Sequence, residues 1–255
     1  MRYFAELSYM GTQYNGWQKQ PNCPSVQATI EEALTTILRK STEVVGCGRT
    51  DTGVHARQYF LHFDFEQDFP KSFLKRLNKY LPPDISFKNI HAVENTAHAR
   101  FDATHRAYEY HIDFRKNPFA THLTYHFPHC YRLDLDLLNE AAQLLLQFDA
   151  FYPFCKSKTD VKTMDCQLYK SEWQLFTGRE EQLVFYIAAN RFLRGMVRLI
   201  VGMCLNVGLK KLHLDEVKKA LEKQERLRKS LSVPPQGLYL MDIHYPFVNQ
   251  KMEGI

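Results

Sequence analysis

Residues 44–65 read VVGCGRTDTGVHARQYFLHFDF, and they predict a strand, a tight loop and a second strand. Val44 and Val45 are typical of the end of a buried strand. Beyond the loop, apolar and polar residues alternate, as expected of a half-buried strand. The apolar positions of this second strand are Tyr59, Leu61, Phe63 and Phe65.

The loop itself, residues 46–56, concentrates unusual chemistry in a short segment. Its three glycines can adopt backbone conformations that other residues avoid. It holds one carboxylate, Asp51, with Arg49 before it and His55 after it. Functional sites are usually built on loops that rigid strands hold in place. We therefore expect this loop to carry the chemistry of the protein.

The rest of the chain predicts an α+β fold, because strands and helices alternate without a regular repeat. Ser25 is placed as the N-cap of a helix over 26–38. Further helices are expected at 71–81, 134–148, 191–207 and 214–229. Strands are expected at 3–9, 85–93, 108–114, 168–176, 183–189 and 238–244. We divide the chain into domains 1–100, which carries the Asp51 loop, and 101–255, which carries the tyrosine and arginine motifs discussed below.

Composition sets broad limits on function. The chain has 255 residues and 45% hydrophobic residues, which is ordinary for a soluble globular protein. Its formal net charge of +5 suits a polyanionic partner but does not require one. Its six cysteines show no C-x-x-C pair, which favours free thiols in a reducing compartment. The N-terminus has no apolar signal segment, and the apolar stretch 199–209 is too short to span a bilayer. The cytoplasm is the expected location, with no membrane contact.

Three interpretations of Asp51 are open. The carboxylate could cap a turn and pair with Arg49. It could instead belong to the D-T-G triplet of an aspartic protease, but such enzymes need two carboxylates that share a proton. The chain offers one such triplet, and the nearby arginine favours the ionised acid. The third interpretation is a single ionised carboxylate that acts as a nucleophile.

Three arginines favour the nucleophile. In the expected helix 191–207, Arg191, Arg194 and Arg198 share one face. Such a stripe is ordinarily a solvated helix surface. Arg198, however, lies among apolar neighbours and is followed by Val201-Gly202, which is typical of close helix packing. A buried arginine needs a carboxylate partner, and Asp51 is a candidate.

Aromatic residues provide a second indication of a polyanionic partner. Tyr108 and Tyr110 share one face of a strand, next to Arg106. They could be packing residues, or they could stack on an unpaired base. The cluster His122, His126, His129 and Cys130 matches no standard zinc spacing, so no metal site is expected. No phosphate-binding or dinucleotide motif is present, so no nucleotide cofactor is expected.

Together these segments resemble the tRNA pseudouridine synthase A family along nearly the whole chain. The catalytic motif of that family resembles Gly48–Ala56, and the match is highly specific. The other matching segments are residues 9–21 with 25–27, 100–103 with 106–110, 192–198 with 201–202, and 237–240. One segment departs from the family pattern, Ala150-Phe151-Tyr152-Pro153-Phe154.

The resemblance implies a cofactor-free isomerase that converts uridine to pseudouridine in tRNA. It implies action at positions 38–40 of the anticodon stem-loop, two similar α+β halves with helices on one face and a cleft between them, and a homodimer. Asp51 would be the nucleophile, attacking either the uracil ring or the sugar carbon, and Tyr108 would stack on the uracil. Arg198 would pair with Asp51, and Arg49 would hold the target base out of the stem.

Four further residues complete the expected substrate contacts: His55, Arg106, Arg191 and Arg194. Arg191 and Arg194 are expected to face phosphates. Two rival functions remain at this point. One is an RNA-binding module without turnover, and the other is the dimeric aspartic protease.

Overall fold

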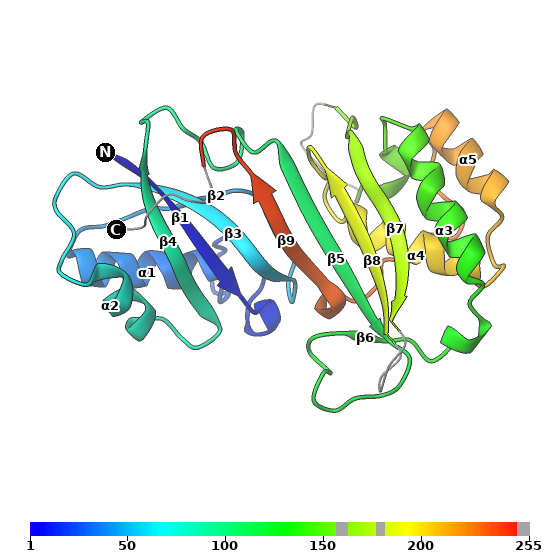
Figure 1. The fold of residues 1–255 in the computed structure, drawn as a ribbon, viewed down its shortest axis with the longest axis horizontal. Helices are drawn as coiled ribbons and strands as arrows, with labels where there is room; N and C mark the ends of the chain where they lie inside the picture. The colour runs from blue at the N-terminus through cyan, green and yellow to red at the C-terminus, as the bar shows by residue number, and fades with distance from the viewer. Residues whose placement is uncertain (157–162, 177–181, 249–255) are drawn as a thin grey trace. The chain divides into compact units, whose positions relative to one another are not determined.

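The computed structural model describes residues 1–156, 163–176 and 182–248. The chain divides into two compact units (Figure 1). The first unit contains Met1–Thr104 and Tyr239–Ile255, and the second contains His105–Leu238. The C-terminal strand therefore clusters with the first unit. The sequence-based domains, 1–100 and 101–255, stay a prediction.

The first unit combines a mixed sheet with two helices. Its strands follow the order β4-β1-β3-β9, with the short strand β2 also paired to β3. The pairs β4/β1 and β1/β3 are antiparallel, whereas β3/β9 is parallel. Helix α2 packs on β4, and α1 packs on α2. The elements are β1 (Arg2–Tyr9), α1 (Val26–Leu38), β2 (Val45–Gly46), β3 (His55–Asp64), α2 (Phe73–Tyr80), β4 (Ile85–Val93) and β9 (Leu238–His244).

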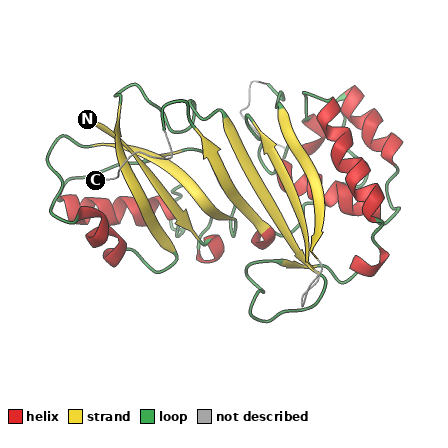
Figure 2. Ribbon diagram, viewed as in Figure 1, coloured by secondary structure: helices red, strands yellow, loops and turns green. Residues whose placement is uncertain are grey.

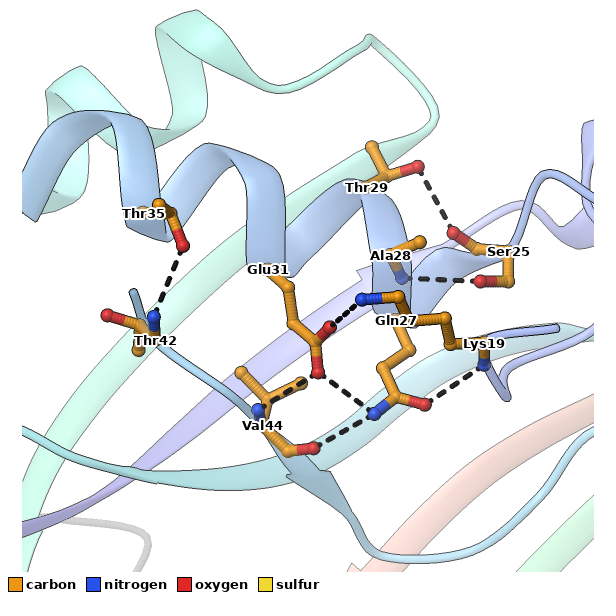
Figure 3. Close-up of polar contacts among 9 residues, drawn as sticks. All are labelled: Lys19, Ser25, Gln27, Ala28, Thr29, Glu31, Thr35, Thr42 and Val44. Atoms are coloured by element: carbon orange, nitrogen blue, oxygen red, sulfur yellow. Dashed lines mark hydrogen bonds and ion pairs between the residues drawn. The ribbon is translucent and has the colours of Figure 1, made fainter. Parts of the chain in front are cut away.

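Helix α1 begins as the sequence predicts. The Ser25 hydroxyl accepts a hydrogen bond from the Ala28 N–H at 3.2 Å, which satisfies a backbone donor of the first turn (Figure 3). The buried face of α1 has the spacing expected of an amphipathic helix packed on a core. Its members are Val26, Ile30, Ala33, Leu34, Ile37 and Leu38.

A polar network ties α1 to the segment that enters the Asp51 loop. Glu31 Oε1 accepts hydrogen bonds from the Gln27 amide and from the Val44 N–H, at 3.0 and 3.2 Å (Figure 3). The Gln27 amide also donates to Val44 O at 3.1 Å, and its Oε1 accepts from the Lys19 N–H at 3.0 Å. Side-chain amides that bond two separate backbone segments fix their spacing. Gln27 and Glu31 thus position the chain just before β2.

The second unit also combines a sheet with helices. Its sheet has the order β5-β8-β7, all antiparallel, with β6 paired in parallel to β5. Helix α3 packs on β7, and α4 and α5 pack on α3 (Figures 1 and 2). The elements are β5 (His105–Asp113), β6 (Tyr125–His126), α3 (Leu135–Leu144), β7 (Leu168–Phe176), β8 (Gln182–Ala189), α4 (Met196–Gly208) and α5 (Leu214–Lys223).

The α+β fold class is therefore confirmed, and the expected strands form. The likeness of the two halves and the cleft between them stay predictions. Helices α2 to α5 are all shorter than the sequence pattern indicates, most clearly at the start of α4 and the end of α5. Helix α5 ends at Lys223, because Gln224 has a φ of +53° and leaves the helical conformation. Helix α4 begins at Met196 and not at residue 191.

Within the described residues, no helix is both long and apolar enough to cross a membrane.

A buried histidine in the first unit predicts acid-sensitive stability. His62, which is 4% exposed, accepts the Ala99 N–H on Nδ1 at 3.1 Å. Burial, and then the nearby Arg2, lower its pKa from 6.5 to about 4. Below about pH 6.5 the unfolded chain gains a proton that folded His62 does not, so stability falls as the pH drops toward 4. His98 lies beside it, and its pKa is lowered in the same direction.

We expect His62→Gln to remove about 2 kcal/mol of this pH-dependent loss, because glutamine can accept the same hydrogen bond without titrating. Urea unfolding between pH 7 and pH 4 measures the loss. The chain has two tryptophans, so a Trp173→Phe background leaves Trp17 as the reporter of the first unit. An unchanged pH dependence in His62→Gln would contradict the assignment.

Candidate active site

The Asp51 loop is held at both ends by the rigid strand β3. Cys47, at the start of the loop, donates its N–H to Phe60 O at 2.8 Å. At the far end, the Val54 N–H donates to Asp51 O at 3.2 Å and closes a turn in which Gly53 has a φ of +76°. The loop chain therefore has little freedom where it presents Asp51.

Three buried aromatic residues brace the middle of this loop. The Tyr59 hydroxyl donates to Gly48 O at 2.5 Å, and its ring stacks on Trp17 with centroids 4.1 Å apart. Burial raises the pKa of Tyr59 well above its ordinary value, so the hydroxyl keeps its proton and remains a donor. The backbone N–H of Trp17 donates to Thr50 O at 3.2 Å, and the Tyr9 hydroxyl lies 3.0 Å from Thr50 Oγ1.

The N-terminal segment packs directly against the loop at a glycine. Gly16 has a φ of +87°, and a Cβ at this position would lie 2.3 Å from Thr50 O. Any other residue would both strain the backbone and push Thr50 away. The Gly53 N–H also donates to Tyr14 O at 3.4 Å. Segment 9–17 is therefore a support for the Asp51 loop, a role that sequence reasoning missed although its glycine and tryptophan were the available signal.

The candidate residues of the first unit differ in exposure. Arg49 is exposed and Asp51 is half-buried. His55 is 1% exposed, its Nδ1 accepts the Gly11 N–H at 3.1 Å, and its ring stacks on Tyr239 at 4.7 Å. A ring nitrogen that accepts a backbone N–H carries no proton, so this imidazole is neutral. His55 thus fixes the end of the loop, and its contact with substrate stays a prediction.

In the second unit, Tyr108 is half-buried on β5. Its ring meets Phe192 edge to face, with centroids 5.1 Å apart and planes at 87°. Tyr110 is fully buried, and its hydroxyl donates to Pro234 O at 2.7 Å. The idea that both tyrosines could offer a stacking surface is therefore wrong for Tyr110, which exposes no face. Tyr108 retains that possibility. Arg106 on the same strand donates from Nη1 to Asn190 O at 2.8 Å.

The expected arginine stripe is not on one helix. Arg191 and Arg194 lie in the connection between β8 and α4, and of the three only Arg198 is in α4. The cause is Gly195, the N-cap of α4, which has a φ of +72°. This left-handed conformation interrupts the helix before Arg194 could join it. The prediction that all three arginines share one helix face is therefore wrong.

Arg198 is nevertheless tightly held. Its Nε donates to Val233 O at 2.7 Å, and the Val233 N–H donates back to Arg198 O at 3.3 Å. One turn further along α4, a Cβ on Gly202 would lie 1.9 Å from Leu231 O. The close packing expected at Val201-Gly202 is confirmed, because the segment around Leu231 crosses the helix there. These contacts fix the direction of the Arg198 guanidinium. Its pairing with Asp51 stays a prediction.

Comparison with known proteins gives a consistent result. The family model for tRNA pseudouridine synthase matches residues 141–246. The chain is 44% identical to tRNA pseudouridine synthase A of Bacteroides thetaiotaomicron, over 96% of this chain and 91% of that one. It is 45% identical to the Porphyromonas gingivalis protein of the same name, over 96% and 97%, and 38% identical to the Bacillus subtilis one, over 96% and 99%.

Similarity to solved structures is weak. A crystal structure of an unknown protein from Galdieria sulphuraria aligns over 82% of this chain and 92% of that chain, with a TM-score of 0.24 and 8% identity. Such a score supports no statement about fold or function. The sequence relatives, by contrast, match nearly end to end at 38–45% identity, and the motif around Asp51 lies on a loop built to hold it. The chain belongs to the tRNA pseudouridine synthase A family.

Proposed function

We propose that this enzyme converts uridine to pseudouridine at positions 38–40 of the anticodon stem-loop of tRNA, with Asp51 as the nucleophile. The observation that carries the proposal is the support of the Asp51 loop by Tyr59, Trp17 and Tyr9. A loop fixed on both sides can present one carboxylate in a constant direction, which positioning for catalysis requires. We place the reaction in the cleft predicted between the two halves, and we propose a homodimer.

The reaction needs no oxidant and no cofactor. The bond from N1 of uracil to C1′ of the ribose breaks, and a bond from C5 to the same C1′ forms. The hydrogen on C5 leaves as a proton, and N1 gains one. Asp51 can hold the intermediate covalently, either through the ring or through the sugar carbon, so that the base is not lost to solvent.

The other candidate residues have roles that follow from their positions. A uridine in a stem must be extruded before it can react, and the lost stacking must be replaced. Tyr108 is half-buried beside Phe192, and we assign its ring to stack on the extruded uracil. We assign Arg49, which is exposed on the Asp51 loop, to hold the base out of the stem. Arg106, Arg191 and Arg194 are assigned to the phosphates, and Arg198 to the carboxylate of Asp51.

Tritium release tests the proposal. A tRNA transcript labelled with tritium at C5 of uridine should release label to water only when pseudouridine forms, because C5 loses its hydrogen in that step. A matched transcript with cytidine at positions 38–40 is the control, and it should release none. Tight RNA binding without release would favour an RNA-binding module. Cleavage of a peptide library without release would favour an aspartic protease.

A further inference from the structure

Helix α2, which packs on β4 in the first unit (Figure 1), carries a concentrated positive charge. Residues 71–80 read KSFLKRLNKY and include no acidic residue. The positive side chains of this segment are all exposed: Lys71, Lys75, Arg76 and Lys79. The whole chain has a formal net charge of +5, and it would have +1 without these four. The charge of this one segment thus nearly equals the net charge of the protein.

The inner face of α2 fixes the helix to the rest of the first unit. Phe73 and Leu77 are buried, and the Phe73 ring stacks on Phe69 with centroids 4.5 Å apart. The Asn78 amide donates to Phe87 O at 2.8 Å, and its Oδ1 accepts the Phe87 N–H at 2.7 Å. A side-chain amide that bonds both groups of one residue ties the helix to β4. The backbone that carries the cations is therefore held in place.

The four cations have no anionic partner among the residues that the structure describes. Within that part of the chain, none of their side chains forms an ion pair, a hydrogen bond or a contact with an aromatic ring. By contrast, four other cations of the same unit form ion pairs: Arg2 with Asp64 at 2.8 Å, Lys19 with Glu31 at 3.2 Å, Lys40 with Glu66 at 3.8 Å and Lys88 with Glu6 at 3.6 Å. The uncompensated charge is therefore a feature of the α2 segment and not of the unit as a whole.

The order of charges along α2 is unfavourable for a helix on its own. Lys75 and Lys79 lie four residues apart, and Arg76 and Lys79 lie three apart, so like charges are neighbours on the outer face and repel each other. Lys71 and Lys75 also lie at the start of the helix, where the helix dipole favours anions over cations. An anion bound along this face would offset both effects.

Helix α5 in the second unit shows how a solvated charged surface is ordinarily arranged. It also carries exposed lysines, Lys218, Lys219 and Lys223. Asp215 precedes Lys219 by four residues, and Glu222 follows Lys218 by four, so these two lysines lie next to opposite charges. Such mixed runs are typical of a helix surface in contact with water. Helix α2 has cations alone, which favours a polyanionic partner.

We propose that the outer face of α2, with Lys71, Lys75, Arg76 and Lys79, binds phosphates of the tRNA backbone. The inference rests on the proposed function only in taking the polyanion to be the tRNA substrate. In the sheet, β1 separates β4, on which α2 packs, from β3, which follows the Asp51 loop. Lysine and arginine contacts to phosphates position a nucleic acid without reading its bases. The α2 surface therefore contributes to tRNA affinity and takes no part in the reaction.

Removal of the charge in the full-length protein tests this surface. The variant Lys75→Gln/Arg76→Gln/Lys79→Gln should weaken binding of full-length tRNA by roughly ten- to thirtyfold near physiological salt. It should also lower the slope of log Kd against log salt by about two to three, the value for three lost phosphate contacts. Glutamine is as good a helix former as lysine, and the repulsion is removed, so the melting temperature should not fall. The kcat at saturating tRNA should match that of the wild type.

The matched control is Lys218→Gln/Lys219→Gln/Lys223→Gln, which removes the same charge from α5. Its Kd for tRNA and its salt slope should stay close to the wild-type values. An equal loss of affinity in the two triple variants would show an effect of net charge alone, and the proposal would be wrong. An α2 variant that binds tRNA like the wild type would overturn it as well.

Vesicles of phosphatidylcholine and phosphatidylserine distinguish RNA from an anionic membrane surface. They should bind the wild type and the α2 variant equally weakly. Vesicle binding that depends on α2, together with unchanged tRNA affinity, would show that the partner is a membrane and not tRNA. Tritium release is measured separately on the same preparations. An enzyme that forms pseudouridine but has an α2 variant with normal tRNA affinity would lose only the α2 proposal. A protein that binds tRNA through α2 without release would lose only the proposed function.

Discussion

Asp51→Asn should abolish pseudouridine formation, with a fall in rate of roughly a thousandfold or more. Asparagine keeps the shape of the side chain but not the negative charge of a nucleophile. The loop around it is held by bonds to Gly48 and Thr50 that do not involve the Asp51 side chain. The variant should therefore fold and bind tRNA like the wild type. Tritium release and RNA affinity, measured on the same preparation, check both halves of this prediction.

Asp68→Asn is the matched control, because Asp68 is an exposed carboxylate of the same unit. It undergoes the same loss of charge and should keep full activity. Activity of Asp51→Asn within tenfold of the wild type would remove Asp51 from the mechanism. A loss of RNA binding in the same variant would make it a binding residue instead.

The sequence predicted the Asp51 loop well because its signals are local. Alternating apolar residues define β3, and the dense chemistry of residues 46–56 marks the loop between strands. The helix over Val26–Leu38 was equally accessible, since Ser25 and a regular apolar face mark its start and its side. These features depend on residues close in sequence, so a pattern can reveal them.

The three arginines show what a sequence pattern does not reveal, the backbone conformation between them. Arg191, Arg194 and Arg198 have helical spacing, but spacing does not report backbone conformation. The positive φ of Gly195 separates the first two from α4, and the close approach of Lys156 is part of what requires a glycine there. That contact joins residues far apart in sequence. A glycine inside a predicted helix was the one local sign that the helix could begin later.

The burial of Tyr108 and Tyr110 also depends on contacts that are distant in sequence. They share a face of β5, so the sequence treats them alike. In the structure Tyr110 is covered, with its hydroxyl bonded to Pro234 O, whereas Tyr108 stays half-buried. The segment that covers Tyr110 lies more than a hundred residues further along the chain. Only the tertiary fold decides which of the two can meet a base.

The same segment, 231–234, also holds the Arg198 side chain in place. Because Arg198 Nε donates to Val233 O at 2.7 Å, the two outer nitrogens of the guanidinium are held in a fixed direction. We predict that they bind the Asp51 carboxylate. A carboxylate in a closed pocket without a cation would shift toward its neutral form, which is not a nucleophile. Lysine has no nitrogen at the Nε position, so it can neither keep the bond to Val233 nor present a fork.

Arg198→Met should therefore cut turnover by roughly 10²- to 10³-fold, a loss of ~3–4 kcal/mol of transition-state stabilisation. RNA affinity should change much less, and Arg198→Lys should recover part of the rate. The residual activity of Arg198→Met should rise with pH, because Asp51 without its cation would ionise at higher pH. Arg228→Met, at an exposed arginine, is the control. An Arg198→Met enzyme with wild-type kcat, or with an unshifted acid limb, would show that Arg198 does not act through the charge of Asp51.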